Sequence, residues 1–475
     1  MLLPCYGRSA RGRAKALGND GAVTPPAFEP AWARLVSAWL AAGPESAGGE
    51  ALLARALDES VHALDLPAAG DVTVGQGRRC EIAVVRLAGA VDEAGYLAHN
   101  QAQAERGAEP VEHFCRRGWR ALRNPSLAFD VWWYWAAYLD PTDESETATN
   151  PLVHYLLDGR HRGLLPLPQR VAGPSFSMTT QPRRACLFAT YDPDGLVDDS
   201  VVAYVAELAR HADVFVLADG TLQPGQLERL SAATGAWVRS HGAHDFGSWS
   251  LLARELVGWE ALAAYDEVLL ANDSCWLLRP LDEVFSRMDA RSCDFWGLQL
   301  TARRFEPEPW QPQTVPLAEV KRSWMPPTAF RYPELVHVGS YFLALRRPVL
   351  DDPGFRRRLD AVVPQRDRAN LVQKYETGTT QYLVGQGFDF DTWVPELRPN
   401  HPIYGPGVFD LLADGFPLFK RRFLVANPYD TPDLADWKAR ISAVVPEAPV
   451  DMFERNLLRV ADPADLARSF AIRSG

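Results

Sequence analysis

The sequence predicts an α/β protein, with a mostly parallel, doubly wound sheet flanked by helices and an N-terminal helical domain before it. From about residue 183 onward, short apolar runs alternate with amphipathic segments of helical period, which is typical of strands joined by crossover helices. Between residues 28 and 172 the apolar spacing is helical. A length of 475 residues with 47% apolar side chains suits about two or three domains with real cores.

The composition excludes some classes of protein. With 49 basic and 60 acidic residues, the net charge of -11 argues against a nucleic-acid partner that tracks phosphates. The six cysteines occur singly, without zinc-site spacing, so we expect reduced thiols. The N-terminus lacks the apolar core of a secretory signal, and no stretch reaches the roughly 18 apolar residues of a membrane span. We therefore expect a cytoplasmic protein with at most peripheral membrane contact.

The first 172 residues divide into a tail and a helical domain. Residues 1–27 are rich in Gly, Ala and Arg without periodicity, and we expect a disordered tail. Residues 28–172 contain an imperfect repeat, in which Asp92-x-x-x-Tyr96 and Pro110-Val-x-His113-x-x-x-x-Gly118 are echoed by Asp130-x-x-x-Tyr134 and Pro151-Leu-Val-His154-x-x-x-x-Gly159. Two copies are too few for a solenoid. The aromatic run 132–138 is expected in the core; a sugar-stacking platform is the alternative.

The remaining chain predicts an α/β domain over residues 183–430 and a helical extension over 431–475. Strands are expected at 185–190, 214–218, 235–239, 268–271, 294–300 and 337–345. Helices are expected at 198–208, 226–234, from about 250, at 281–288, at 366–383, at 433–444 and at 465–470. Residues 301–336 hold seven prolines and no clear period, so we expect a long loop that covers a ligand.

Polar side chains follow the first expected strand. Tyr191, Asp192 and Asp194 lie in the turn between this strand and the next helix. Carboxylates at such a turn suit recognition of a nucleoside, whose base and ribose offer hydrogen-bond donors. The alternative is an acidic helix start that the helix dipole favours.

A second polar group follows the third expected strand. It contains His244, Asp245, Gly247 and Trp249. Backbone N–H groups at the start of the next helix, with Gly247 permitting close approach, suit a phosphate or sugar oxygen of a donor. Asp245 would accept from a sugar hydroxyl, although His244 and Asp245 could equally cap the helix.

The buried strand at 268–271 ends abruptly in Asn272-Asp273-Ser274. This register resembles the metal-binding Asp-x-Asp strand end of GT-A glycosyltransferases, with Asn272 and Ser274 in place of the two outer acids. Because Mg²⁺ and Mn²⁺ prefer carboxylate oxygens, the turn favours a diphosphate site over a metal site, and Asp273 is the one candidate metal ligand. A turn that caps the next helix is the alternative.

Several motifs in one order carry a more specific resemblance. They are Tyr191-Asp-x-Asp-Gly195, His244-Asp-Phe-Gly-Ser-Trp249, Tyr265-Asp-Glu-Val-Leu-Leu-Ala-Asn-Asp-Ser274, Cys293-Asp-Phe-Trp-Gly297 and His337-Val-Gly-Ser-Tyr-Phe342. Over residues 183–429 the chain resembles the rhamnan synthesis protein F family, whose members are associated with rhamnose-containing surface polysaccharides. The family more usually has Tyr at position 244 and a smaller pair at Cys275-Trp276.

The resemblance implies a GT-A-like glycosyltransferase that moves a deoxyhexose, with dTDP-rhamnose the favoured donor, to a lipid-linked or growing glycan at the inner face of the membrane. In that fold Glu376 would accept the proton of the acceptor hydroxyl, with Asp294 and Asp245 as rival candidates. The alternative for Glu376 is an ion pair with Lys374 or Arg366 on a solvated face.

His337 would meet the acceptor, or serve structure alone. Lys420 would offset the charge of the leaving diphosphate; a basic patch facing anionic lipid is the alternative.

Two other functions are compatible with this sequence. The missing outer acids suit a non-catalytic glycan-binding or scaffold subunit of a polysaccharide assembly complex. An enzyme of the same fold that uses a UDP- or GDP-hexose has the same sequence features.

Overall fold

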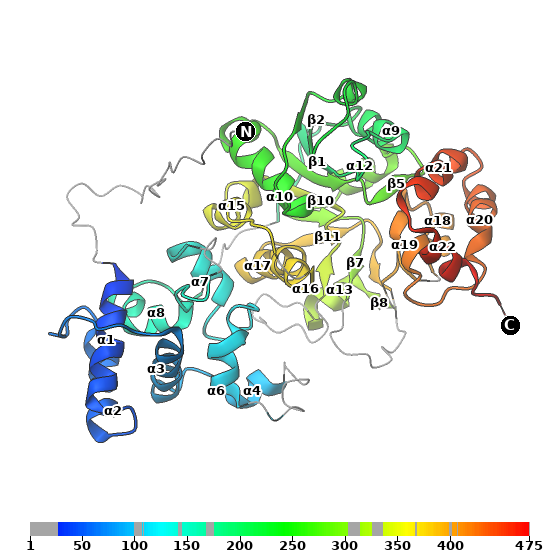
Figure 1. Ribbon diagram of the computed structural model, residues 1–475. Coiled ribbons are helices and arrows are strands. Elements are labelled where there is room, and N and C mark those ends of the chain that lie inside the picture. The colour runs from blue at the N-terminus through cyan, green and yellow to red at the C-terminus, as the bar shows by residue number, and fades with distance from the viewer. Residues whose placement is uncertain are drawn as a thin grey trace, which may run out of the picture.

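A seven-stranded sheet forms the centre of the molecule (Figure 1). Its strands, in spatial order, are β11 (Phe390–Thr392), β6 (Phe295–Gly297), β10 (Phe342–Arg346), β4 (Glu267–Asn272), β1 (Arg184–Thr190), β2 (Asp213–Ala218) and β3 (Gly235–Val238). All neighbours pair in parallel except β10, which runs antiparallel to β4 and β6. This confirms the predicted α/β class and the mostly parallel sheet.

The computed structural model describes residues 27–98, 107, 109–140, 145–167, 175–302, 314–324, 336–365, 368–398, 401–405 and 407–474. The predicted tail and most of the predicted covering loop at 301–336 lie outside these residues. Between the two undescribed parts of that loop, β8 (Val315–Pro316) pairs with β12 (Glu396–Leu397). No helix within the described ranges is both long and apolar enough to cross a lipid bilayer.

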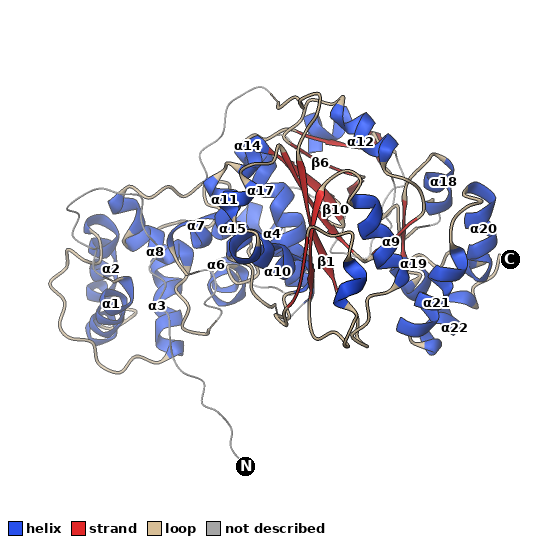
Figure 2. Cartoon of the chain, turned by 90° about the horizontal axis from the view of Figure 1, so that it is seen from above, coloured by secondary structure: helices blue, strands red, loops and turns tan. Residues whose placement is uncertain are grey.

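Helices cover both faces of the sheet, which explains why its central strands are continuous apolar runs. Successive β1 residues point to opposite faces. Leu187 packs in one core with α10 (His244–Leu251), α15 (Pro353–Asp360) and α17 (Gly378–Gln386). Phe188 packs in the other core with α9 (Asp199–Leu208) and α12 (Asp282–Asp289), and Figure 2 shows α9 and α10 on opposite sides of the strands.

A buried ion cluster joins the amino-terminal ends of β1 and β4 to the end of β10. Glu267 accepts from Arg184 Nε at 2.9 Å, from Arg346 Nε at 3.1 Å and from Trp296 Nε1 at 2.7 Å. Glu267 and Arg346 are fully buried, and the Arg346 guanidinium also donates to the carbonyls of Met288 and Arg291. Because a buried charge is costly unless all its hydrogen bonds are made, this cluster fixes the three strands in one register.

The chain after β11 packs against the face that carries α9. It forms α18 (Val408–Ala413), β13 (Leu418–Lys420), α19 (Arg421–Ala426), α20 (Trp437–Val444), α21 (Val450–Val460) and α22 (Pro463–Phe470). Trp276, on β5 (Cys275–Leu277), stacks on Phe453 with ring centroids 4.9 Å apart and also on Trp437. The large side chain at position 276 is therefore the anchor of these terminal helices.

The described residues before β1 are helical, with α1 (Phe28–Ala42), α2 (Ala47–Glu59), α3 (Val74–Leu87), α4 (Glu93–Ala98), α6 (Pro110–His113), α7 (Val131–Tyr138) and α8 (Pro151–Leu157). The aromatic run on α7 is buried from Trp132 to Trp135. Its burial favours the core interpretation of this run over the sugar platform.

The sequence repeat is also a structural repeat. Tyr96 and Tyr134 each form a hydrogen bond of 2.8 Å with Nδ1 of the histidine in their own copy, His113 or His154. A Cβ on the glycine that follows, Gly118 in the first copy, would overlap the Tyr96 hydroxyl. Gly159 meets the Tyr134 hydroxyl in the same way. The shared residues therefore encode one buried Tyr–His–Gly contact, made twice.

Several elements differ from the sequence-based expectations. The helix expected at 226–234 is a short 3-10 turn, Leu227–Leu230. The strands expected at 294–300 and 337–345 are each broken, and their outer pieces β7 (Leu300–Thr301) and β9 (His337–Val338) pair with each other. Helix α10 begins at His244 rather than after Trp249, and α21 was not predicted.

Replacement of Gly159 by alanine should destabilise the protein by about 1–3 kcal/mol, because the added methyl must displace the buried Tyr134 hydroxyl. Urea unfolding measures this difference. The control is Gly75→Ala, at an exposed position in the first turn of α3, where a Cβ meets nothing within 4 Å and the substitution should leave stability unchanged or slightly raised. Equal stability of the two variants would refute the role assigned to the repeat glycines.

Candidate functional site

The turn Asn272–Ser274 lies at the carboxyl end of β4, beside the end of β1. The Asn272 amide donates to Asp245 Oδ2 at 2.6 Å, and its carbonyl oxygen accepts from the Ser274 N–H at 3.1 Å and from the Ser274 hydroxyl. Asp273 Oδ2 instead accepts from Thr190 Oγ1 at 2.8 Å and from the Tyr191 N–H at 3.0 Å. The structure therefore brings Asp245 and all three residues of the turn together.

Lys420 reaches the same turn from the far end of the sequence. It ends β13, which pairs antiparallel with β5 so that Lys420 lies opposite Cys275. Its Nζ donates to Ser274 Oγ at 2.6 Å. Burial disfavours the ammonium charge, but neighbouring acidic groups, Cys275 foremost and Asp245 among them, outweigh it and raise the pKa of Lys420. Lys420 is thus a charged member of the site and does not form an outward-facing lipid patch.

Glu376 lies on a π-helical turn, Val372–Thr377, between α16 (Arg368–Leu371) and α17. Its Oε2 accepts from Ser340 Oγ at 3.1 Å. The charge of Glu376 acts on both Asp245 and Lys420. Asp245, Glu376 and Lys420, which come from three distant parts of the sequence, therefore share one electrostatic environment.

Asp245 is the most perturbed carboxyl of the group. It lies in the first turn of α10 and is half-buried. Burial, then the charge of Asp273, raises the pKa of Asp245 to about 7, while Lys420 opposes the shift. Burial also raises the pKa of Asp273. A carboxyl with a pKa near neutral in a polar cluster, such as Asp245, is typical of functional sites.

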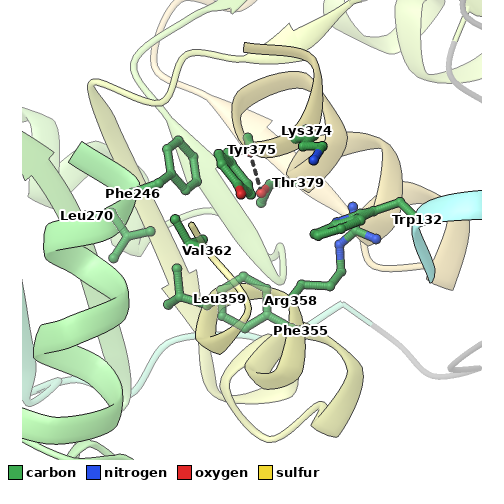
Figure 3. A pocket seen from close by; sticks show the side chains of 10 residues that line it. All are labelled: Trp132, Phe246, Leu270, Phe355, Arg358, Leu359, Val362, Lys374, Tyr375 and Thr379. Carbon is green, nitrogen blue, oxygen red and sulfur yellow. Dashed lines mark hydrogen bonds between the residues drawn. The ribbon is translucent and has the colours of Figure 1, made fainter. Parts of the chain in front are cut away.

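The adjacent aromatic residues tie two site elements together. Phe246 of α10, which follows Asp245, stacks on Tyr375, which precedes Glu376, with ring centroids 5.7 Å apart. Both rings line a small cavity, which Figure 3 shows from close by. Trp132 of α7 lies across this cavity (Figure 3).

Two cations face Trp132 from the α/β part of the chain. The Arg358 guanidinium lies 5.4 Å and the Lys374 ammonium 5.5 Å from the centroid of the Trp132 ring. Burial lowers the pKa of Arg358 to about 10. The helical region before β1 therefore contacts the turn that carries Glu376, through Trp132.

Asp294 does not join the site. The register pairs Leu345 with both Val268 and Phe295, so Asp294, just before Phe295, lies at the edge of the sheet where β4 begins. The turn Asn272–Ser274 lies at the opposite edge. Asp294 accepts from the N–H groups of Phe176 and Asp389 at 3.0 and 2.8 Å. Its expected role as a base is not supported, because the sheet separates it from the other residues.

His337 lies on β9, where it pairs with Thr301, and it is 4% exposed. The N–H of its neighbour Val338 donates to Thr380 Oγ1 of α17 at 3.1 Å. Ser340, three residues after His337, donates to Glu376. Residues 337–340 therefore help to hold α17 and the π-helical turn that carries Glu376. Direct contact of His337 with an acceptor remains a prediction.

At the start of α10, Gly247 and Trp249 contact other parts of the protein, where the sequence predicted contacts with the donor. A Cβ on Gly247 would lie 2.6 Å from the His241 ring, so the missing side chain makes room for His241 rather than for a phosphate. Trp249 is fully buried, and its Nε1 donates to the Ala271 carbonyl at 3.1 Å. His244 is exposed at positive φ. The sequence did not indicate His241, whose Nε2 lies 3.0 Å from Ser248 Oγ.

An arginine that sequence reasoning missed occupies the acidic loop after β1. Arg459 of α21 pairs with Asp192 at 2.5 Å, Asp194 at 2.8 Å and Asp198 at 3.1 Å. Hydrogen bonds to these carboxylates, that to Asp192 first, raise the pKa of Arg459. The acids thus fix α21 in place, and a nucleoside would have to bind beside this ion cluster. Tyr191, 59% exposed, remains accessible there.

Elsewhere, three potential metal ligands lie close together at Glu207, His211 and Asp282. Arg210 already pairs with Glu207 at 2.8 Å and with Asp282 at 2.9 Å. The guanidinium supplies the positive charge that a metal ion would bring. This group is therefore an ion-pair network on α9 and α12.

Asp245→Asn should raise the melting temperature more at pH 8 than at pH 5. With its pKa raised to about 7, folded Asp245 holds a proton between about pH 4 and 7 that the unfolded chain releases. The carboxyl therefore costs stability as pH rises through that window, and asparagine removes the cost. Because the attraction to Lys420 is also lost, we expect a gain on the order of 1–3 kcal/mol at pH 8.

Thermal unfolding at both pH values measures the effect of Asp245→Asn. The control is Asp58→Asn on an exposed position of α2, which should change little at either pH. The same shift at pH 5 and pH 8 would contradict the raised pKa.

Comparison with known proteins supports the assignment of these residues to one unit. Residues 214–470 match the model of a family described as rhamnan synthesis protein F. A comparison with curated proteins finds no match. The matched range covers more than half of the chain and contains the turn Asn272–Ser274, Glu376, Lys420 and Arg459. The chain belongs to the rhamnan synthesis protein F family, which indicates a role in the synthesis of rhamnan polysaccharide.

Proposed function

We propose that this chain is a glycosyltransferase that moves a sugar from a nucleoside diphosphate donor to a glycan acceptor, with dTDP-rhamnose as the favoured donor. The observation that supports this most is the contact of Asp245 and Lys420 with the turn Asn272–Ser274, with Glu376 near enough for its charge to act on both. In open α/β sheets, ligands bind at the carboxyl ends of the strands, which is where this turn lies. Family membership supplies the polysaccharide context.

The donor would extend across the ends of β1 and β4. Exposed Tyr191 offers its ring to a nucleobase, because stacking of bases on aromatic side chains is favourable. The diphosphate would then lie between Tyr191 and Lys420, which supplies a positive charge for it. Ser274 and Asn272 would orient that charge through their hydrogen bonds.

The acceptor hydroxyl would approach from the side of Glu376. In the transfer, the acceptor oxygen forms a bond to the anomeric carbon, the bond from that carbon to the diphosphate oxygen breaks, and the hydroxyl proton passes to a carboxylate. Glu376 is the proposed acceptor of this proton. Asp245 is the alternative, since its pKa of about 7 suits a group that gains and loses protons near neutrality.

Glu376→Gln should lower the transfer rate about 10²–10⁴-fold, because the amide cannot accept the proton. The affinity for dTDP should stay within about threefold, since Glu376 faces the acceptor in this proposal. Transfer from radiolabelled dTDP-rhamnose to an isolated rhamnan acceptor measures the rate, and calorimetry measures dTDP binding. Glu283→Gln, on an exposed position of α12, is the control that should leave both unchanged.

If Glu376→Gln lost dTDP affinity as strongly as it lost transfer rate, Glu376 would not be the base. A lowered free energy of unfolding of this variant would have the same meaning. Loss of transfer in Asp245→Asn alone would assign the step to Asp245. Both variants are informative because the two carboxyls lie on different elements, α10 and the π-helical turn.

A non-catalytic glycan-binding or scaffold subunit is the second candidate function. It is favoured by the missing outer acids of the turn and by Arg459, which already occupies Asp192 and Asp194. A thermal-shift screen with dTDP, UDP, GDP and their sugars separates the two functions, because a ligand that binds only the folded state raises its melting temperature. Stabilisation by one nucleotide identifies the donor class. No stabilisation by any of them would favour the scaffold.

A further inference from the structure

The turn Asn272–Ser274 offers few free oxygens to a metal ion. The Asn272 carbonyl oxygen accepts two hydrogen bonds from Ser274, and the Asn272 amide presents N–H donors toward Asp245. Asp273 is the one carboxylate of the turn, and its Oδ2 already accepts from Thr190 and Tyr191. Mg²⁺ and Mn²⁺ require several hard oxygen ligands in a defined geometry. The turn itself, with one carboxylate whose Oδ2 is already bonded, is therefore a poor set of ligands for a divalent ion.

The positive charge that such an ion would supply is already in the turn. Lys420 Nζ lies 2.6 Å from Ser274 Oγ, and the pairing of β13 with β5 fixes its backbone beside the turn. The ammonium also lies 5.2 Å from the centroid of the Tyr341 ring. A divalent ion at the turn would have to approach this ammonium closely, and the two positive charges would repel each other.

The surroundings of Lys420 keep it charged and in place. The negative charges of Asp245 and Glu376 act on it, and its Nζ lies 5.2 Å from the ring centroid of Tyr341 and 6.0 Å from that of Tyr404. Tyr341 is itself only 5% exposed, so the surrounding core holds its ring in place. Lys420 is therefore a positioned cation at the turn.

We propose that Lys420 takes over the neutralisation of the donor diphosphate, so that donor binding and sugar transfer need no divalent metal. This inference rests on the proposed glycosyltransferase function. When the bond between the anomeric carbon and the diphosphate oxygen breaks, both bonding electrons stay on that oxygen, and the Lys420 ammonium stabilises the added charge. Arg421, whose N–H donates to the Ser274 carbonyl at 3.3 Å and whose charge acts on Asp273, adds a second cation near the turn.

The first test compares binding of dTDP, UDP and GDP to the full chain by calorimetry, in EDTA and in excess Mn²⁺. We expect the affinity for the nucleotide that binds to agree within about threefold between the two conditions. Binding that appears only with Mn²⁺, or tightens more than about tenfold, would overturn metal independence while leaving the proposed function intact. Absence of binding of all three by folded protein would overturn both.

The second test replaces the ammonium. Lys420→Met should weaken nucleotide binding about 10–100-fold in EDTA, as expected for loss of a charge-assisted hydrogen bond. Lys420→Arg should keep it within about tenfold, because the charge remains. The matched control is Arg422→Met, two positions on and exposed, which should leave affinity unchanged.

Unchanged affinity in Lys420→Met would refute the role of Lys420. If Lys420→Met does not fold, Lys420→Arg and the EDTA comparison on the unaltered chain still decide the proposal. A loss of affinity in Lys420→Met that Mn²⁺ restores would also count against it, since a metal would then have its own ligands.

Discussion

The buried pairing of Glu267 with Arg184 and Arg346 is the constraint on which the rest of the structure depends. Three adjacent strands bring these charges to one level at the edge of the sheet where β4 begins, and burial makes their alignment obligatory. Once that edge is fixed, the opposite edge is fixed as well. There β4 delivers Asn272–Ser274 beside the end of β1, at positions set by the same register. A costly internal charge cluster at one edge thus holds the polar groups of the other edge in place.

The sequence predicted the central strands and the polar turn, because a buried parallel strand is a short apolar run and its end is abrupt. Local pattern could not reveal what fills the space around a residue. Gly247 marks close approach, but whether a phosphate or His241 approaches is decided by the fold. Arg459 lies 267 residues from Asp192, and no local signal links them. Asp294 is different, since an acid that precedes a parallel strand belongs to the edge opposite to one that follows it.

The helical region before β1 also supports the candidate site. Trp132 faces Arg358 and Lys374, and Lys374 lies on the same π-helical turn as Glu376. On the other side of the cavity, Tyr375 stacks on Phe246, the neighbour of Asp245 (Figure 3). Asp245 and Glu376 are therefore backed by one aromatic layer to which the N-terminal helices contribute. Such a layer fixes a short turn that would otherwise depend on its own few hydrogen bonds.

The triple pairing of Arg459 has a consequence for how the protein is made. Asp192, Asp194 and Asp198 leave the ribosome more than 250 residues before the arginine that binds them. Domains form from the N-terminus during translation, so the central sheet can assemble while these three carboxylates repel one another. Their mutual repulsion is relieved only when α21 is synthesised and docks. The charge balance of the loop that borders the candidate donor site is thus completed late in synthesis.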